Sequence, residues 1–288
     1  MSVRPERPHL LVRIAVVVAA AQLIWQVMAW LDDILFPGEE LTTVNHVVNA
    51  SVVFVLAVPM VWAARRYLDR RPWGGLGLTG AREGWRPFLV GAAAWGLPGG
   101  AAIAMCLAMG WSSIGAAVPW TDLVPGVALL AVLVLVFEAV PEELIFRGYL
   151  FRNLNTAMPA WLAVLAQAGL FALFGTTLWV LSEGWGVLAG RLPLFLVMGI
   201  VLGCVRVVTG NVWACVGFHL VFQTVAQTLL SSGDVEIQGV DALTATAFLA
   251  PFVFGVPTAM LLALRTGRWR RREPDPIDPE GLPRRGRR

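Results

Sequence analysis

The stretch VLVLVFEAVPEELIFRGYL, from Val132 to Leu150, decides how this sequence is interpreted. It begins as an apolar run typical of a membrane span. It then places three carboxylates and a guanidinium within ten residues, and these are Glu138, Glu142, Glu143 and Arg147. Ionisable groups inside a bilayer are costly and usually mark a functional site. The alternative is that the four residues lie among the headgroups and only end the span.

The composition of the 288-residue chain favours a membrane protein. Its mean hydropathy is +0.70, 57% of its residues are hydrophobic and 14% are charged, whereas about a quarter of a soluble domain is charged. The basic residues, all Arg, lie in short loops and a tail, which argues against nucleic-acid binding. Cys106, Cys204 and Cys215 lie in apolar segments and form no CxxC pair, so we expect neither a disulfide framework nor a thiol-rich metal site.

Windows of about 20 apolar residues predict an all-α polytopic membrane protein with eight transmembrane helices. The windows are 10–31, 44–64, 88–110, 123–146, 160–181, 191–209, 212–232 and 245–265. If the N-terminus is cytoplasmic, 21 of the 22 basic residues fall on the cytoplasmic side, as the positive-inside rule expects. We therefore predict that both termini are cytoplasmic and that the protein is a multi-pass protein of a bacterial plasma membrane.

Four regions follow from this pattern. Residues 1–121 hold the first three helices, residues 122–232 hold the core with its charged motifs, residues 233–267 hold the last helix, and residues 268–288 form a disordered basic tail. Two interpretations of the tail stay open, because its Arg clusters could contact anionic lipid headgroups or only anchor the topology.

The loop PWGGLGLTG, residues 72–80, superficially resembles a phosphate-binding turn. It follows no predicted strand and lacks the full spacing of such a turn. We therefore interpret it as a juxtamembrane loop.

Helical spacing separates the roles of the acids. Glu143 and Arg147 are four residues apart, with the acid first, which is the favourable order for an ion pair within a helix. Glu138 and Glu142 share another face, and Glu142 has no partner in its own helix. Two neighbouring carboxylates in a poor dielectric raise the pKa of at least one of them, which is one way to prepare a general base. We predict Glu142 as that base and Glu138 as an auxiliary residue.

A helix distant in the sequence supplies a possible partner for Glu142. His219 lies in the middle of NVWACVGFHLVFQTV, about 10 Å from the predicted start of its span at Val212. This depth is close to that of Glu142, so the two side chains could meet across a helix interface. Gln223 lies one turn beyond His219 on the same face. A site formed by Glu142, His219 and Gln223 is therefore predicted.

These residues resemble a known family. The segment PEELIFRG is similar to the EExxxR motif of the CPBP intramembrane proteases, which include type II CAAX prenyl endopeptidases and bacteriocin-processing or immunity (Abi) proteins. The resemblance covers residues 122–232, including VMGIVLGCVRVVTGNVWACVGFHLVFQ. It implies that the chain hydrolyses a peptide bond of a membrane-associated peptide or protein at the cytoplasmic side of the lipid bilayer. It also implies residue roles: Glu142 activates water, Glu143 and Arg147 hold the helix, and His219 and Gln223 stabilise the oxyanion.

The sequence departs from the family pattern at two positions. The FxxxH motif falls on FALFG, from Phe171 to Gly175, which ends in glycine instead of histidine. Gln223 replaces the family's Asn or Asp, but it keeps the amide donors on a longer arm. The family is often called metalloprotease, so zinc is implied only by analogy. A catalytic zinc needs three protein ligands, and the chain has one well-placed histidine and no HExxH, so we predict no bound metal and no other cofactor.

Three functions are consistent with these observations. The first, which we favour, is an active intramembrane endopeptidase. The second is a pseudoprotease that binds a membrane peptide or partner without cutting it, and the missing histidine at position 175 favours this reading. The third is a transporter or channel whose buried charges line a pathway, although the chain shows no visible internal repeat.

Overall fold

The computed structural model describes residues 7–38 and 42–276, and it confirms the predicted all-α architecture. Within these residues, eight helices are long and apolar enough to cross a membrane, as predicted. They are Leu10–Leu35, Thr43–Asp69, Trp73–Ala108, Trp120–Ala157, Ala160–Glu183, Trp185–Thr209, Val212–Leu230 and Val240–Arg265. The cytoplasmic location of the termini stays a prediction.

Shorter elements interrupt or join the spans. In chain order the elements are α1 (Leu10–Leu35), α2 (Thr43–Ala63), η1 (Ala64–Asp69), η2 (Trp73–Leu76), α3 (Ala81–Ala108), β1 (Ser113–Ala116), α4 (Trp120–Val134), η3 (Leu135–Ala139), α5 (Val140–Glu143), η4 (Leu144–Leu150), α6 (Phe151–Ala157), α7 (Ala160–Glu183), η5 (Trp185–Val187), α8 (Leu188–Thr209), α9 (Val212–Leu230), β2 (Val235–Gln238), α10 (Val240–Leu243), η6 (Thr244–Leu249) and α11 (Ala250–Arg265).

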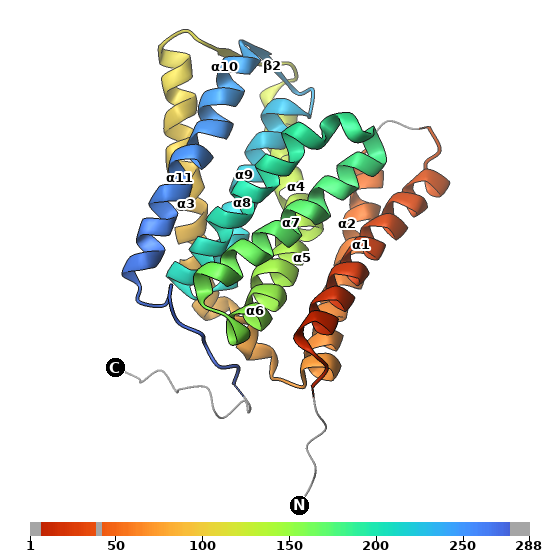
Figure 1. Ribbon diagram of the computed structural model, residues 1–288. Coiled ribbons are helices and arrows are strands. Elements are labelled where there is room, and N and C mark those ends of the chain that lie inside the picture. Colours follow the sequence, from red (N-terminus) through yellow and green to blue (C-terminus); the bar gives the residue numbers. More distant parts are fainter. Residues whose placement is uncertain (1–6, 39–41, 277–288) are drawn as a thin grey trace, which may run out of the picture.

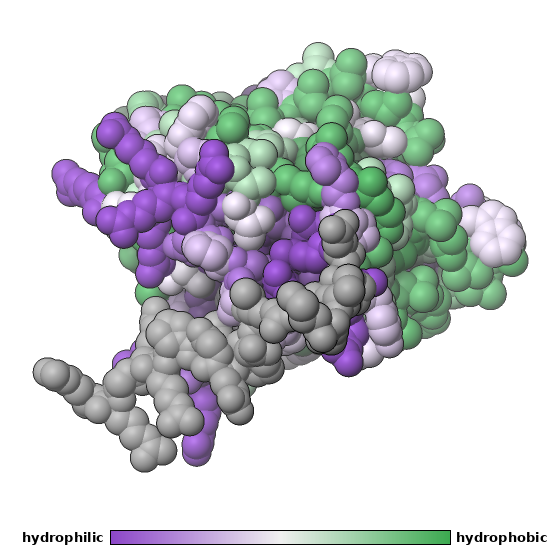
Figure 2. Space-filling model, turned by 60° about the horizontal axis from the view of Figure 1, so that its bottom comes forward, coloured by the Kyte–Doolittle hydropathy of each residue, from purple (hydrophilic) through white to green (hydrophobic). Residues whose placement is uncertain are grey.

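The helices pack as neighbouring pairs along the bundle (Figure 1). The most extensive contacts join α3 to α9 and α7 to α8, while α11 packs on α8 and α1 on α2. At one end of the bundle β1 and β2 form a two-stranded antiparallel sheet, in which Ser113 pairs with Gln238 and Ala116 with Val235. At the opposite end α1 begins and α11 ends. We call this second end the arginine-rich face, because Arg65, Arg152, Arg206 and Arg268 lie there. Figure 2 shows hydrophilic side chains gathered on it.

The fourth span carries the charged motif in its interior. The helix continues to Ala157, well past the predicted end at residue 146. Two π-helical segments, η3 and η4, flank the short α5 that carries Glu142 and Glu143. Pro141 has no amide hydrogen, so regular α-helical bonding is interrupted at α5, and π-helical turns occur frequently at functional sites. The helix therefore does not end at the carboxylates.

The chain after α11 is packed against the arginine-rich face. We call residues Arg268–Pro276 the C-terminal strap. This differs from the prediction of a disordered tail over 268–288, because Trp269 and Asp275 are both buried. Residues 277–288 of that tail lie outside the described residues. The prediction failed because it weighed composition alone, and the partners that order the strap come from distant helices.

Backbone bonds from the strap complete the start of α7. The first amide groups of a helix have no partner within the helix. Here Ala160 donates its N–H to the carbonyl of Arg271 at 3.1 Å, and Trp161 donates to the carbonyl of Trp269 at 3.0 Å. The strap therefore acts as a cap for α7.

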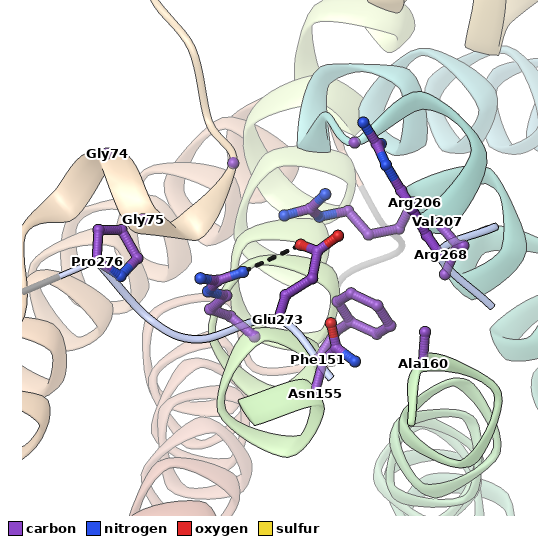
Figure 3. Close-up of a pocket in the computed structure, with 13 residues that line it drawn as sticks. Gly74, Gly75, Phe151, Asn155, Ala160, Arg206, Val207, Arg268, Glu273 and Pro276 are labelled. Carbon is purple, nitrogen blue, oxygen red and sulfur yellow. Dashed lines mark hydrogen bonds and ion pairs between the residues drawn. The ribbon is translucent and has the colours of Figure 1, made fainter. Parts of the chain in front are cut away.

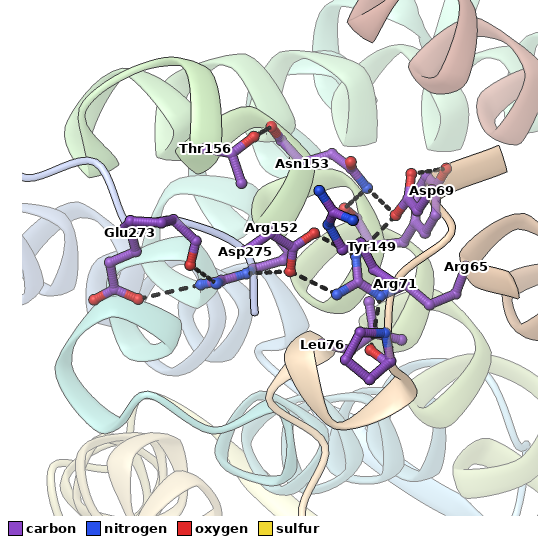
Figure 4. A network of polar contacts seen from close by, with 12 residues as sticks. Arg65, Asp69, Arg71, Leu76, Tyr149, Arg152, Asn153, Thr156, Glu273 and Asp275 are labelled. Atoms are coloured by element: carbon purple, nitrogen blue, oxygen red, sulfur yellow. Dashed lines mark hydrogen bonds and ion pairs between the residues drawn. The ribbon is translucent and has the colours of Figure 1, made fainter. Parts of the chain in front are cut away.

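Asp275 anchors the strap by its side chain (Figure 4). Both of its oxygens accept hydrogen bonds from Arg65, at 2.6 and 2.7 Å, and Arg152 adds a bond at 3.3 Å. Arg7 lies 3.4 Å from the same carboxylate. Burial alone would raise the pKa of Asp275, but the bonds and charges of Arg65 and Arg152 outweigh it and hold that pKa below its ordinary value.

A second carboxylate, Asp69, connects four elements on the same face. It is fully buried and accepts bonds of 2.9 Å from Arg13, Arg65, Tyr149 and Asn153. These donors come from α1, η1, η4 and α6. The Asp69 network therefore joins the first, second and fourth spans.

Candidate functional site

Close backbone packing sets the position of α9. Gly91 of α3 and Gly217 of α9 each lie so close to the other helix that a Cβ atom would overlap the backbone of Ala214 or Phe88. Two residues after Gly217 the helix has turned by about 200°. His219 therefore projects away from α3, toward the charged motif of the fourth span.

His219 meets Glu143. The Nδ1 atom of His219 lies 2.9 Å from Oε1 of Glu143, and Nη1 of Arg147 donates to that same oxygen at 2.9 Å. All three side chains are buried. A carboxylate paired with a guanidinium can only accept hydrogen bonds, so Nδ1 of His219 carries a proton. Its Nε2 atom is then the ring nitrogen that remains for a ligand.

Arg147 is held on its other side by an aromatic ring. Its guanidinium lies 4.3 Å from the centre of the Phe171 ring, which is within the range of a cation–π contact. Several polar atoms of this cluster nevertheless have no hydrogen-bond partner in the described part of the chain, and these are Oε2 of Glu143 and Nε and Nη2 of Arg147. The cluster is therefore only partly satisfied by the protein.

A polar face of α9 runs opposite the other two acids. His219, Gln223 and Gln227 are spaced by four residues and share this face. The amide of Gln227 donates to Oε1 of Glu138 at 2.8 Å. Glu138 and Glu142 are partly exposed, and both lie within electrostatic range of His219. The structure thus brings together the predicted residues of the fourth span and of α9.

Two features of this interface differ from the sequence interpretation. We paired His219 with Glu142, but the direct contact is with Glu143, to which we had given only a role in holding the helix. Gln227, which bonds Glu138, was not among the predicted site residues. The regular spacing of His219, Gln223 and Gln227 along an apolar helix was the signal that could have revealed it.

The degenerate motif position is filled from α8. A Cβ atom at Gly175 would lie 3.0 Å from atoms of the Phe195 ring, and that ring also packs edge-on against Phe171 at 5.7 Å between centres. Phe171 contacts Arg147, and Gly175 follows one turn deeper, near the level of Glu143. The space that a histidine at position 175 would use is therefore occupied by Phe195.

The donor set does not suit a catalytic zinc. Such a site needs three protein ligands and an open position. His219 is the only histidine in this cluster, so it could supply one ligand, through Nε2, because Nδ1 bonds Glu143. Within residues 7–38 and 42–276, no group of three or more His, Cys, Asp or Glu side chains is arranged to hold a metal ion. The residues present do not fit the metal that the family resemblance implies.

Comparison with known proteins places the motifs in one family. Residues 124–225 match the family described as Rce1-like, type II CAAX prenyl endopeptidase Rce1-like. This range contains the charged motif of the fourth span, Gly175, His219 and Gln223. A search of curated proteins gave no match. The family match and the eight apolar helices support an integral multi-pass membrane protein of the CPBP/CAAX protease type.

Proposed function

We propose that this chain is an endopeptidase that hydrolyses a peptide bond of a membrane-associated substrate, because residues 124–225 match the type II CAAX prenyl endopeptidase family. One observation carries the proposal: Glu143 and His219, which are 76 residues apart in the sequence, form a buried hydrogen bond of 2.9 Å beside the partly exposed Glu142. Hydrolysis of a peptide bond needs a base that activates water and a second group that acts on the carbonyl oxygen. Glu142 and His219 are placed for these two roles.

Glu142 is the base in this proposal. It is the acid of the pair without a hydrogen bond in the described part of the chain, so its oxygens remain for a water molecule. Glu142 takes a proton from water while the water oxygen bonds to the carbonyl carbon. The same proton then passes to the leaving amine nitrogen as the C–N bond breaks. The products are a carboxylic acid and an amine, so atoms and charges balance.

His219 and Gln223 act on the carbonyl oxygen. With Nδ1 held by Glu143, a proton on Nε2 of His219 makes that atom a donor toward the substrate. Gln223 adds amide donors one turn along α9. Donors of this kind stabilise the oxyanion of the tetrahedral intermediate, often as the largest catalytic contribution. Glu143 and Arg147 are positioning residues because they orient the imidazole.

The test compares Glu142→Gln with the parent chain in proteoliposomes. The probes are a prenylated CAAX peptide and a panel of membrane-anchored peptides, with products identified by mass spectrometry. We expect turnover to fall about 10²–10⁴-fold, with the melting temperature in detergent unchanged. The matched control is Glu183→Gln, an exposed acid at the end of α7, which should keep full activity. Equal turnover in Glu142→Gln would remove the role assigned to it.

One observation favours a second function. Phe195 fills the space at Gly175 that a motif histidine would need, so the histidine of the family's FxxxH motif has no equivalent there. The second candidate is a protein that binds a membrane peptide without cleaving it. Crosslinking of the same probes to the parent chain, with no cleavage product above that of Glu142→Gln, would select this candidate.

A further inference from the structure

A separate pocket lies on the arginine-rich face, away from Glu142 and His219. It encloses about 200 Å³ and is lined from η2, α6, α8 and the C-terminal strap. Figure 3 shows Arg206 and Arg268 on one side of it, with the carboxylate of Glu273 projecting inside. Arg152 also lines the pocket. Three guanidinium groups therefore share this space with one carboxylate.

Arg206 is a buried cation without an acidic partner. Its side chain is buried, and its Nε and Nη2 atoms donate only to the carbonyls of Arg147 and Leu76, at 3.1 and 3.0 Å. No carboxylate within the described ranges lies within 4.0 Å of it. The remaining nitrogen, Nη1, has no hydrogen-bond partner there and is not among the fully enclosed atoms. A buried charge is normally paired, so this group points to an anion that the protein itself does not provide.

The juxtamembrane loop PWGGLGLTG forms one wall of the pocket. Gly74, Gly75 and Gly77 all belong to PWGGLGLTG. A Cβ atom at Gly77 would collide with the guanidinium of Arg206, so glycine permits this close approach. The loop has no strand before it and carries no positive charge of its own. Arginine residues of α6, α8 and the strap bring positive charge to it in the fold.

Glu273 occupies the pocket only loosely. Its side chain is 46% exposed, and it contacts Arg152 at 3.3 Å. The strap does not depend on this contact, because Asp275 is held by two shorter bonds from Arg65. An external anion could thus displace the Glu273 carboxylate while the strap stays bound.

We propose that this pocket binds a phosphate group, with Arg206, Arg268 and Arg152 as its ligands and Glu273 as an internal competitor. Guanidinium groups match the geometry of phosphate oxygens and bind them by paired hydrogen bonds. The phosphate could belong to the headgroup of an anionic phospholipid or to a free phosphate, and the experiment distinguishes these sources.

The first measurement is thermal unfolding of the full chain in detergent. Inorganic phosphate should raise Tm by about 2–4 °C in a saturable manner, relative to sodium chloride of equal ionic strength. The rise should disappear in Arg206→Gln and Arg268→Gln and persist in Arg270→Gln, an exposed strap residue outside the pocket. In Glu273→Gln half-saturation should move to lower phosphate, because the competing carboxylate is gone.

The second measurement is native mass spectrometry after reconstitution with phosphatidylglycerol in phosphatidylcholine. The lipid is the source if the parent and Arg270→Gln retain phosphatidylglycerol, if Arg268→Gln does not, and if inorganic phosphate leaves Tm unchanged. If Arg206→Gln does not fold, Arg268→Gln and Glu273→Gln decide the question. Neither phosphate nor lipid binding, or equal binding in all variants, would overturn the proposal.

Discussion

Asp69 and Glu143 are both fully buried carboxylates, yet their surroundings differ. Each oxygen of Asp69 accepts two hydrogen bonds. In Glu143, by contrast, Oε1 receives both donors, from Arg147 and His219, and Oε2 receives none. The first carboxylate lies at the arginine-rich face and the second inside the bundle.

The difference supports the proposed division of roles, in which the Asp69 network stabilises the fold and the Glu143 cluster serves the reaction. Buried polar atoms in proteins are almost always paired, so an unpaired one calls for an explanation. The Asp69 network has its acceptors used and joins three spans. The Glu143 cluster leaves Oε2 and two nitrogens of Arg147 unused. Such an arrangement costs stability and leaves hydrogen-bonding capacity for a bound water or substrate.

The largest expected effect comes from breaking the saturated cluster. Asp69→Asn places a donor against donors and leaves Arg13 without its carboxylate. Breaking a buried ion pair by changing one partner costs about 3–5 kcal/mol. Unfolding in mixed SDS micelles, followed by circular dichroism, measures this loss. The control Asp122→Asn, at an exposed residue of α4, should change stability by less than about 0.5 kcal/mol. Equal stability of the two variants would mean that Asp69 is not the centre of a structural network.

A smaller loss of stability is expected when the missing motif histidine is restored beside the Glu143 cluster. Gly175→His forces a side chain against the Phe195 ring, and overpacking of this kind costs about 1–3 kcal/mol. The same change in a Phe195→Ala background should cost less, because the ring is gone, and should raise peptide cleavage. A double-mutant cycle on unfolding free energies gives the coupling between positions 175 and 195. Additive effects would show that Phe195 does not compete for this space.

The contrast between the two clusters also explains what could be predicted from sequence. Eight apolar windows and the i, i+4 spacing of Glu143 and Arg147 are local signals. Residues 7–38 and 42–276 contain eight helices long and apolar enough to cross a membrane, and they contain that ion pair. The choice between Glu142 and Glu143 as the contact of His219 is not local. It depends on the rotation of two helices, and the π-helical turns around α5 alter that rotation.

The C-terminal strap was missed for a related reason. Its composition is that of a disordered segment, but order comes from Arg65 and Arg152, which are far away in sequence. The sequence shows that Gly175 replaces the motif histidine. It does not show that the Phe195 ring occupies the space beside Gly175. Side-chain contacts between different helices were thus the feature that could not be predicted from the sequence.

The smallest expected effect is a local response of the strap to acid. The guanidinium groups of Arg65 and Arg152 hold the pKa of Asp275 below its ordinary value of 3.8. A depressed pKa means that the ionised group stabilises the fold above the ordinary value, and that this contribution is lost as the pH falls through the lowered one. Hydrogen exchange of the strap amides, corrected for intrinsic rates, should therefore accelerate by about tenfold, or about 1.4 kcal/mol, when the pH is taken below 3.8.

The variant Asp275→Asn separates this effect from general acid unfolding. This variant lacks the titrating carboxylate. The strap amides should therefore exchange quickly already at neutral pH, and their exchange should not accelerate further in acid. Asp122→Asn, whose side chain is far from the strap in the fold, should follow the parent chain. Acceleration in acid that is the same in Asp275→Asn as in the parent would assign the opening to other carboxylates. The contacts of Asp275 with Arg65 and Arg152 would then contribute little to the stability of the strap.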